Sequence, residues 1–271
     1  MTTLAHLSDL HLGASAANER AAAALVAKLR ETRVDHVVLT GDVTESGRIE
    51  EYELFLSLFL PLKREGRLTV VPGNHDRSGD DVAELLSDEL RVSVDRRDGL
   101  FMVCVDSTAP HNRSLIRCHG ELCERMLEAV DQALGLAPRG ALVAVLLHHH
   151  VLPLPVESFG EWFADVCGWP NAAELPLGRK LLERVRGRCD LVLHGHRHVP
   201  RHFTVDGGRG RPLQVVNAGS STALGAYRVF SHEAGRVEAV RWEHTALAPR
   251  PSPHLFSPAV SLRLGEAQAT G

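Results

Sequence analysis

Residues 69–76 read TVVPGNHD, a short β-branched run followed by a proline, a glycine and three polar side chains. The run favours a buried strand. A turn alone would explain Gly73 and Asn74, but Asn-His-Asp directly after a valine-rich strand is unusual. The stretch therefore predicts a strand whose carboxyl end carries metal-binding chemistry.

Four more segments repeat this arrangement of a hydrophobic run followed by Asp or His. Open α/β sheets place their sites at the carboxyl ends of the strands, so the five segments are predicted to converge on a two-metal hydrolytic centre. The four segments are Asp9-Leu10-His11 after residues 4–7, Gly41-Asp42 after residues 37–39, His148-His149-His150 after residues 143–147, and Gly195-His196-Arg197-His198 after residues 191–193.

The spacing within these segments suits metal binding. Asp9 and His11 lie two residues apart, so in an extended segment both side chains point the same way and can grip one ion. His196 and His198 repeat this spacing. In three segments a glycine precedes the candidate ligand, where the chain must turn sharply and come close to the site. Asp and His ligands suit Mn, Fe or Zn better than Ca, which prefers an all-oxygen shell.

The composition is that of an ordinary globular protein. The chain has 271 residues and a net charge of -4, so it lacks the global basic footprint of a strong nucleic-acid binder. The N-terminus has no basic region followed by a long apolar stretch, and the longest apolar runs are far too short to span a bilayer. These features predict a cytoplasmic protein with reduced cysteines and no membrane span.

Strands and helices are predicted to alternate through the first two-thirds of the chain, which indicates an α/β fold. After residue 199 the pattern changes to short strands separated by glycine-rich turns, at Asp206-Gly207-Gly208 and at Glu233-Ala234-Gly235. This part is predicted to be an antiparallel meander that completes a second sheet. Helices are predicted at 18–33, 49–62, 81–88, 120–134 and 176–185, and further strands at 100–105, 202–205, 213–217, 227–232 and 237–242.

Two segments interrupt this pattern. Residues 151–177 are rich in proline, glycine and aromatics, and they either cap the pocket or pack a small core of their own. From residue 246 onward four prolines exclude a helix or a central strand. We therefore expect one domain over residues 1–245, and over residues 246–271 an extended arm that embraces a second subunit in a homodimer, or a disordered tail.

The five segments together resemble the calcineurin-like metallophosphoesterase family, over about residues 4–199. The family pattern is Asp-x-His, Gly-Asp, Gly-Asn-His-Asp or Glu, a later His after a strand, and Gly-His-x-His, and each element occurs here in order. The resemblance implies a four-layer α/β/β/α sandwich of two mixed sheets with flanking helices. It also implies two divalent transition-metal ions and a metal-bridging hydroxide that attacks a phosphoester.

The resemblance also assigns roles by position. His75 would donate a proton to the leaving group, and Asp76 would orient it. Among the three consecutive histidines His148 is the expected ligand, although His149 or His150 remains an alternative. The first ion would be bound by Asp9, His11 and His198 and the second by Asn74, His148 and His196, with Asp42 bridging both; candidates to contact the ligands or the substrate are His149, His150, Arg197, Asn18 and Trp162.

Residues between the predicted ligands indicate which branch of the family the chain resembles. Residues 43–45 (VTE) and Pro72 differ from the Ser/Thr phosphatase pattern, and Glu45 stands where purple acid phosphatases have a tyrosine. The segment around residues 39–52 is similar to the bacterial branch that cleaves cyclic nucleotides and glycerophosphodiesters. A phosphodiesterase acting on a small phosphoester is therefore expected. The alternatives are a nuclease, a lipid-linked pyrophosphatase or a phosphomonoesterase on the same scaffold, and, more remotely, a binding module without metals.

Overall fold

The computed structural model describes residues 1–87, 90–109, 120–152, 175–208, 210–248 and 259–262. The strands are β1 (Thr2–Leu7), β2 (His36–Thr40), β3 (Leu68–Val71), β4 (Val92–Arg97), β5 (Leu100–Val105), β6 (Leu142–Leu146), β7 (Leu191–His194), β8 (Arg201–Val205), β9 (Leu213–Asn217), β10 (Ala226–Glu233), β11 (Arg236–His244) and β12 (Val260–Leu262). The helices are α1 (Ala16–Thr32), α2 (Ile49–Arg64), α3 (Ala83–Leu86), α4 (Glu124–Leu134), α6 (Gly178–Val185) and α7 (Ser221–Leu224), with a 3₁₀ turn at His75–Arg77.

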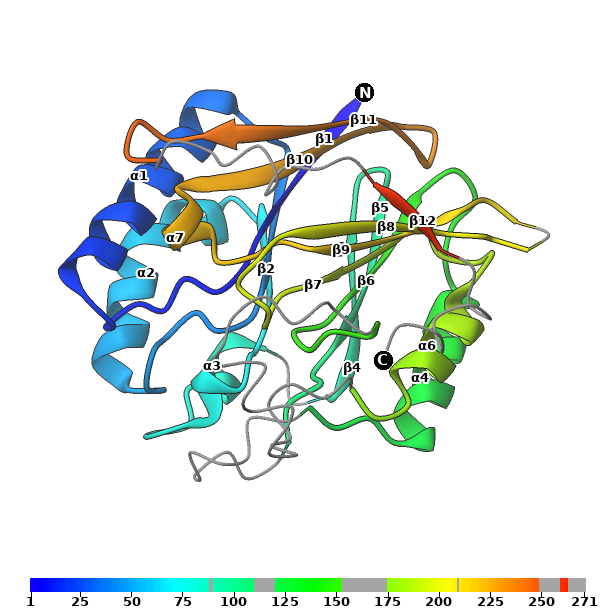
Figure 1. Cartoon of the computed structure of the whole chain (residues 1–271), viewed down its shortest axis with the longest axis horizontal. Coiled ribbons are helices and arrows are strands. Elements are labelled where there is room, and N and C mark those ends of the chain that lie inside the picture. The colour runs from blue at the N-terminus through cyan, green and yellow to red at the C-terminus, as the bar shows by residue number, and fades with distance from the viewer. Residues whose placement is uncertain (88–89, 110–119, 153–174, 209, 249–258, 263–271) are drawn as a thin grey trace.

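Two mixed sheets form the centre of the molecule. One sheet has the strand order β11-β10-β1-β2-β3, and the other has the order β12-β8-β9-β7-β6-β5-β4. Figure 1 shows α1 and α2 on one side of the molecule and α4 and α6 on the other, with the strands between them. The predicted four-layer sandwich of two mixed sheets with flanking helices is therefore confirmed.

Alternation along the strands divides the core into three apolar clusters. In β1, Leu4 points to the space between the sheets, whereas Ala5 and Leu7 point outward. The inner cluster joins the facing sides of the two sheets. The two outer clusters cover the remaining faces, one with buried residues of α1 and α2 and the other with those of α4 and α6. Burial of both faces explains why the central strands read as continuous hydrophobic runs.

The strands that carry the predicted ligands run parallel within each sheet. β1, β2 and β3 are parallel neighbours in the first sheet, and β5, β6, β7 and β9 are parallel neighbours in the second. Parallel strands end at a common edge, so the loops that follow β1, β2, β3, β6 and β7 are available to one site.

The C-terminal third differs from the predicted meander. Its two hairpins are present, since β8 pairs with β9 and β10 with β11, both antiparallel. They belong, however, to different sheets. The chain crosses between the sheets through the short helix α7, which Ser220 caps by accepting a hydrogen bond from the backbone N–H of Ala223. Alternation within each strand could not reveal to which sheet the strand belongs.

Several element boundaries also differ. The helix predicted over 120–134 begins at Glu124, the one predicted over 176–185 begins at Gly178, and that predicted over 81–88 is the four-residue α3. The antiparallel edge strand β4 was missed, because it is only half-buried and ends in charged residues. Among the described helices, none combines the length and apolarity needed to cross a bilayer.

The two irregular segments are described only in part. Within the predicted arm, β12 lies at the edge of the seven-stranded sheet, where it pairs parallel with β8. Residues 249–258 and 263–271 lie outside the described residues, and so do residues 153–174 of the predicted pocket insert. Trp162, a candidate pocket residue, lies among them.

Candidate metal centre

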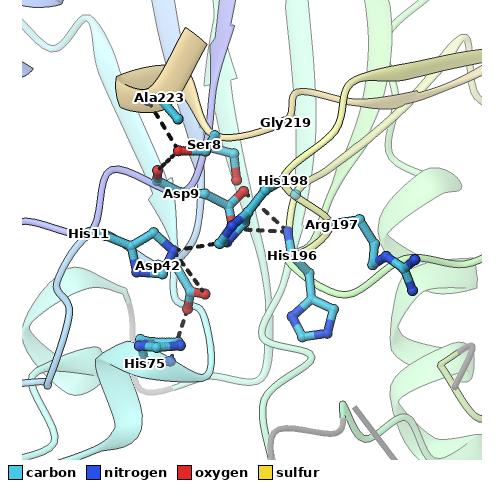
Figure 2. Close-up of polar contacts among 12 residues, drawn as sticks. Ser8, Asp9, His11, Asp42, His75, His196, Arg197, His198, Gly219 and Ala223 are labelled. Carbon is cyan, nitrogen blue, oxygen red and sulfur yellow. Dashed lines mark hydrogen bonds and ion pairs between the residues drawn. The ribbon is translucent and has the colours of Figure 1, made fainter. Parts of the chain in front are cut away.

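All seven predicted ligands lie together at the carboxyl edge of the strands, and most of them appear in Figure 2. Six of them form two groups: the first is Asp9, His11 and His198, and the second is Asp42, His148 and His196. The donor atoms within each group lie within 4.8 Å of one another. The seventh, Asn74, completes the second group, because its Oδ1 lies 3.1 Å from His148 Nε2 and 3.0 Å from His196 Nδ1.

Asp42, a member of the second group, also faces the first group. Its Oδ2 is 3.3 Å from His148 Nε2 and 3.9 Å from His11 Nε2, so one carboxylate faces a ligand of each group. Its other oxygen, Oδ1, accepts a hydrogen bond of 2.9 Å from the backbone N–H of His75. This arrangement orients the carboxylate between the two groups and suits a bridging ligand.

Four ligand residues adopt left-handed backbone conformations, with φ of 52° at Asp9, 47° at His11, 49° at Asp42 and 69° at His196. The expectation that Asp9 and His11 share one face of an extended segment is therefore wrong. Their side chains meet because the chain turns over the strand end. Such conformations cost about 1–3 kcal/mol each and are typical of functional sites. Hydrogen bonds from Asp9 N to Gly41 O (3.0 Å) and from His11 N to Asp42 O (3.1 Å) hold the turn.

The three predicted glycines allow this close approach. A Cβ on Gly41 would overlap the ring of His148, and one on Gly73 would overlap Asp42. A Cβ on Gly195 would overlap Ser8 and Asp9. A larger residue at any of these glycines would push a ligand out of place.

Hydrogen bonds select the nitrogen that each histidine presents. His148 Nδ1 donates to the carbonyl oxygen of Thr40 at 2.7 Å, which leaves Nε2 facing Asp42 and Asn74. His11 Nδ1 lies 2.8 Å from Glu45 Oε2, which leaves Nε2 facing His198 Nε2 at 3.1 Å. Ligand histidines commonly pair their second ring nitrogen with a carbonyl or a carboxylate in this way.

The electrostatics also fit a cation site. Burial acts to lower the pKa of His148, but the Asp42 carboxylate outweighs burial and raises this pKa to about 9. Burial acts to raise the pKa of Asp42, yet His148 holds it well below its usual range. Burial raises the pKa of Asp9 to about 6. Buried carboxylates and imidazoles with nitrogen and oxygen donors turned inward suit transition-metal ions, so the residues fit two such ions.

The three consecutive histidines all lie close to the ring of His196. Their ring centroids lie 5.2 Å (His148), 4.8 Å (His149) and 5.7 Å (His150) from that of His196, since β6 ends at Leu146 and the chain bends at His148 and His149. Only His148 places a ring nitrogen against Asp42 and Asn74. His149 Nδ1 lies 2.9 Å from Ser107 Oγ, and His150 stacks on His196 with 12° between the ring planes.

His75 and Asp76 lie at the site but not as a pair. His75 Nδ1 donates to the carbonyl oxygen of Glu45 at 2.6 Å, so Asp76 does not orient this ring as the sequence predicted. Asp76 is fully buried, and its carboxylate accepts from the N–H groups of Gly73, Val43 and Thr44 and from the Thr44 hydroxyl. Asp76 therefore clamps the Gly-Asn-His loop to the Gly-Asp loop.

Two other candidates act away from the ligand atoms. The side-chain amide of Asn18 donates to the carbonyls of Leu10 (3.3 Å) and His11 (3.5 Å), so it supports the backbone of the first ligand loop. Figure 2 shows the Arg197 side chain pointing away from Asp42 and His11.

Two contacts were missed by the sequence analysis. The Ser220 hydroxyl donates to the carbonyl of Asp9 at 2.9 Å, and Thr222 Oγ1 donates to that of Leu10 at 3.1 Å. Both residues follow β9, a further strand with a polar carboxyl end, which was a signal available in the sequence. Glu45 was noted only for its position, and its contacts with His11 and His75 required the structure.

The chain is similar to known phosphoesterases. The profile of a family described as calcineurin-like phosphoesterase matches residues 2–200. The chain is 30% identical over 166 residues to a probable cyclic nucleotide phosphodiesterase of Rhodococcus erythropolis, and this alignment covers 55% of this chain and 52% of that protein. It is 22% identical over 174 residues to a probable cyclic nucleotide phosphodiesterase of Xenorhabdus bovienii, and this alignment covers 63% of each of the two chains. The matches thus span about half to two-thirds of those relatives.

Solved structures share the fold. A dimetal phosphatase from Danio rerio superposes with a TM-score of 0.61 at 14% identity, covering 86% of this chain and 93% of that one. A purple acid phosphatase from yellow lupin seeds superposes with a TM-score of 0.57 at 13% identity, covering 89% of this chain and 53% of that one. At these identities the likeness concerns the arrangement of sheets and helices.

Proposed function

The chain belongs to the calcineurin-like phosphoesterase family, and from this premise we propose that it is a dinuclear metal-dependent phosphodiesterase acting on small phosphodiesters such as cyclic nucleotides. The position of Asp42 carries the proposal, since one carboxylate oxygen faces a histidine of each ligand group. Such a carboxylate can hold two ions at the short separation that two-metal hydrolases use.

The two ions, when bound, would lower the pKa of a water molecule, and their positive charge would stabilise the phosphoryl oxygens. Side chains of the protein would hold both ions in place. Asp9, His11 and His198 would bind one ion, and Asn74, His148 and His196 would bind the other, with Asp42 shared. Of the histidines in these two groups, His198 has the exposed side chain, which marks the open side of the centre.

His75 is proposed to donate the proton to the leaving oxygen. Its Nδ1 is held by the Glu45 carbonyl, so Nε2 is the nitrogen free to meet substrate. Burial acts to lower the pKa of His75, but Asp42 and the Glu45 carbonyl outweigh burial and raise this pKa above its ordinary value. The raised pKa favours the protonated ring that a general acid requires.

The substrate class rests on the branch that the chain resembles. The segment around residues 39–52, which contains the bridging aspartate, is similar to that branch, and the relatives in Rhodococcus erythropolis and Xenorhabdus bovienii are named as probable cyclic nucleotide phosphodiesterases. The net charge of -4 gives no electrostatic support to the nuclease alternative. An assay with a phosphomonoester and a pyrophosphate-linked lipid distinguishes the phosphomonoesterase and lipid-linked pyrophosphatase alternatives from a phosphodiesterase.

The test is a panel of substrates with protein reconstituted in Mn²⁺, Fe²⁺ or Zn²⁺. The panel contains cyclic nucleotides, glycerophosphodiesters, a phosphomonoester, a pyrophosphate-linked lipid, single-stranded DNA and bis-p-nitrophenyl phosphate. We expect the diesters to be hydrolysed and Asp42→Ala to remove the activity, while Asp98→Ala, in an exposed turn, keeps it. Normal turnover by Asp42→Ala at matched metal would refute the mechanism, and a preference for the monoester would refute the substrate class.

A further inference from the structure

We propose that Glu45 is the positioning residue of this centre, which holds the ligand His11 through its side chain and the proton donor His75 through its backbone. The proposal rests on the proposed function for the roles of these two histidines. Glu45 Oε2 lies 2.8 Å from His11 Nδ1, and the Glu45 carbonyl oxygen lies 2.6 Å from His75 Nδ1. One residue thus contacts both imidazoles on the side away from their working nitrogens.

The carboxylate determines how His11 is presented. A carboxylate on Nδ1 keeps the proton on that nitrogen, so Nε2 carries the lone pair that a metal needs. His11 Nε2 faces His198 Nε2 at 3.1 Å and Asp42 Oδ2 at 3.9 Å. The contact with Glu45 therefore fixes which edge of the His11 ring faces the ligand group.

The same geometry argues against Glu45 as a direct ligand. A carboxylate oxygen of Glu45 forms, with His11 and His75, a cluster that could by itself hold an ion. Yet Glu45 Oε2 meets His11 at Nδ1, whereas the ligands His198 and Asp42 face it at Nε2. The imidazole therefore stands between the carboxylate and the ion position, as in a carboxylate–histidine–metal arrangement.

The backbone of Glu45 is held independently of its side chain. Its N–H donates to the Leu12 carbonyl at 2.9 Å, and the preceding Thr44 forms a bridge with Leu12 and binds the Asp76 carboxylate. The rings of His11 and His75 meet edge to face, with centroids 4.7 Å apart. A side-chain substitution at Glu45 should therefore release His11 while the carbonyl continues to hold His75.

This separation gives the experiment a distinctive signature. Glu45→Ala and Glu45→Gln are compared with the wild type and with Glu53→Ala, an exposed control on α2. Co²⁺ binding is measured by visible absorption and by chelator competition, and folding by circular dichroism. We expect Glu45→Ala to lose about 10- to 100-fold in affinity for one of two Co²⁺ ions, and Glu45→Gln, which keeps an acceptor oxygen, to recover most of that loss.

Turnover supplies the second readout. With Co²⁺ raised to saturation, kcat of Glu45→Ala for bis-p-nitrophenyl phosphate should return to within a few-fold of wild type, because the carbonyl still holds His75. Unchanged Co²⁺ affinity in Glu45→Ala would overturn the proposal. Equal loss of affinity in Glu45→Gln and Glu45→Ala would show a direct ligand instead, which also overturns it. Since Co²⁺ binding is read without substrate, a wild type that binds two ions but hydrolyses no diester would refute the proposed function alone.

Discussion

Metal binding at neutral pH should release a proton from His148. The Asp42 carboxylate, 3.3 Å from His148 Nε2, outweighs burial and raises the pKa of His148 to about 9 in the metal-free protein. A histidine must be neutral to bind a metal. At pH 7 the ring lies two units below this pKa, and at 1.36 kcal/mol per unit deprotonation costs about 2.7 kcal/mol, or roughly 100-fold in apparent affinity.

Isothermal titration with Mn²⁺ in two buffers of different ionisation enthalpy measures the released protons directly. We expect about one proton per protein at pH 7 and an affinity for one ion that rises about tenfold per pH unit between pH 6.5 and 8. The control is His202→Gln, because burial lowers the pKa of His202 to about 4 and that ring is already neutral. Release in His202→Gln should match the wild type.

The metal-free protein should show the opposite trend in stability. A histidine whose folded pKa is raised stabilises the fold fully below its unfolded value of 6.5, and this contribution is lost as pH rises through about 9. The His148 contribution to the melting temperature should therefore fall between pH 6.5 and 9. A metal affinity independent of pH over 6.5–8, together with no proton release, would refute the ion pair between His148 and Asp42.

Three substitutions test other contacts. His75→Ala should keep both metal ions, by metal analysis, but lower kcat by about 10²–10⁴-fold for substrates with poor leaving groups; loss of an ion would show His75 to be a ligand. Asp76→Ala should lower the free energy of unfolding, in urea, by about 3 kcal/mol or more, because buried N–H groups of Gly73 and Thr44 lose their acceptor; an unchanged midpoint would contradict the clamp. Arg228→Met should raise the free energy of unfolding by about 1 kcal/mol or more, since burial lowers the pKa of Arg228 to about 10 and its Nε and Nη1 find no hydrogen-bond partner in the described part of the chain; destabilisation would show that the contact of the guanidinium with the Trp242 ring, 4.6 Å away, outweighs the cost of burying the charge.

The sequence by itself determined most of the buried strands and which polar residues gather at their carboxyl ends. Hydrophobic runs such as residues 37–39 and 191–193 are buried on both faces, so their strands are recognisable from local composition alone. Because a site at the carboxyl ends of parallel strands follows from topology, the polar residues after those runs can be grouped from the sequence alone. The glycines at 41, 73 and 195 were predictable for the same local reason.

Only the tertiary structure decided how those residues are held. Asp9 and His11 meet through left-handed turns rather than strand alternation, because the energy of such a turn is offset by contacts with another loop. The partners of His75 and Asp76 differ from the predicted pair for the same reason, since each bonds to the segment at residues 43–45, about thirty positions away in the chain. The division of the C-terminal hairpins between two sheets is likewise a long-range choice. Hydrophobic periodicity records which face of a strand is buried, whereas the partner that buries it is chosen only when distant segments pack together.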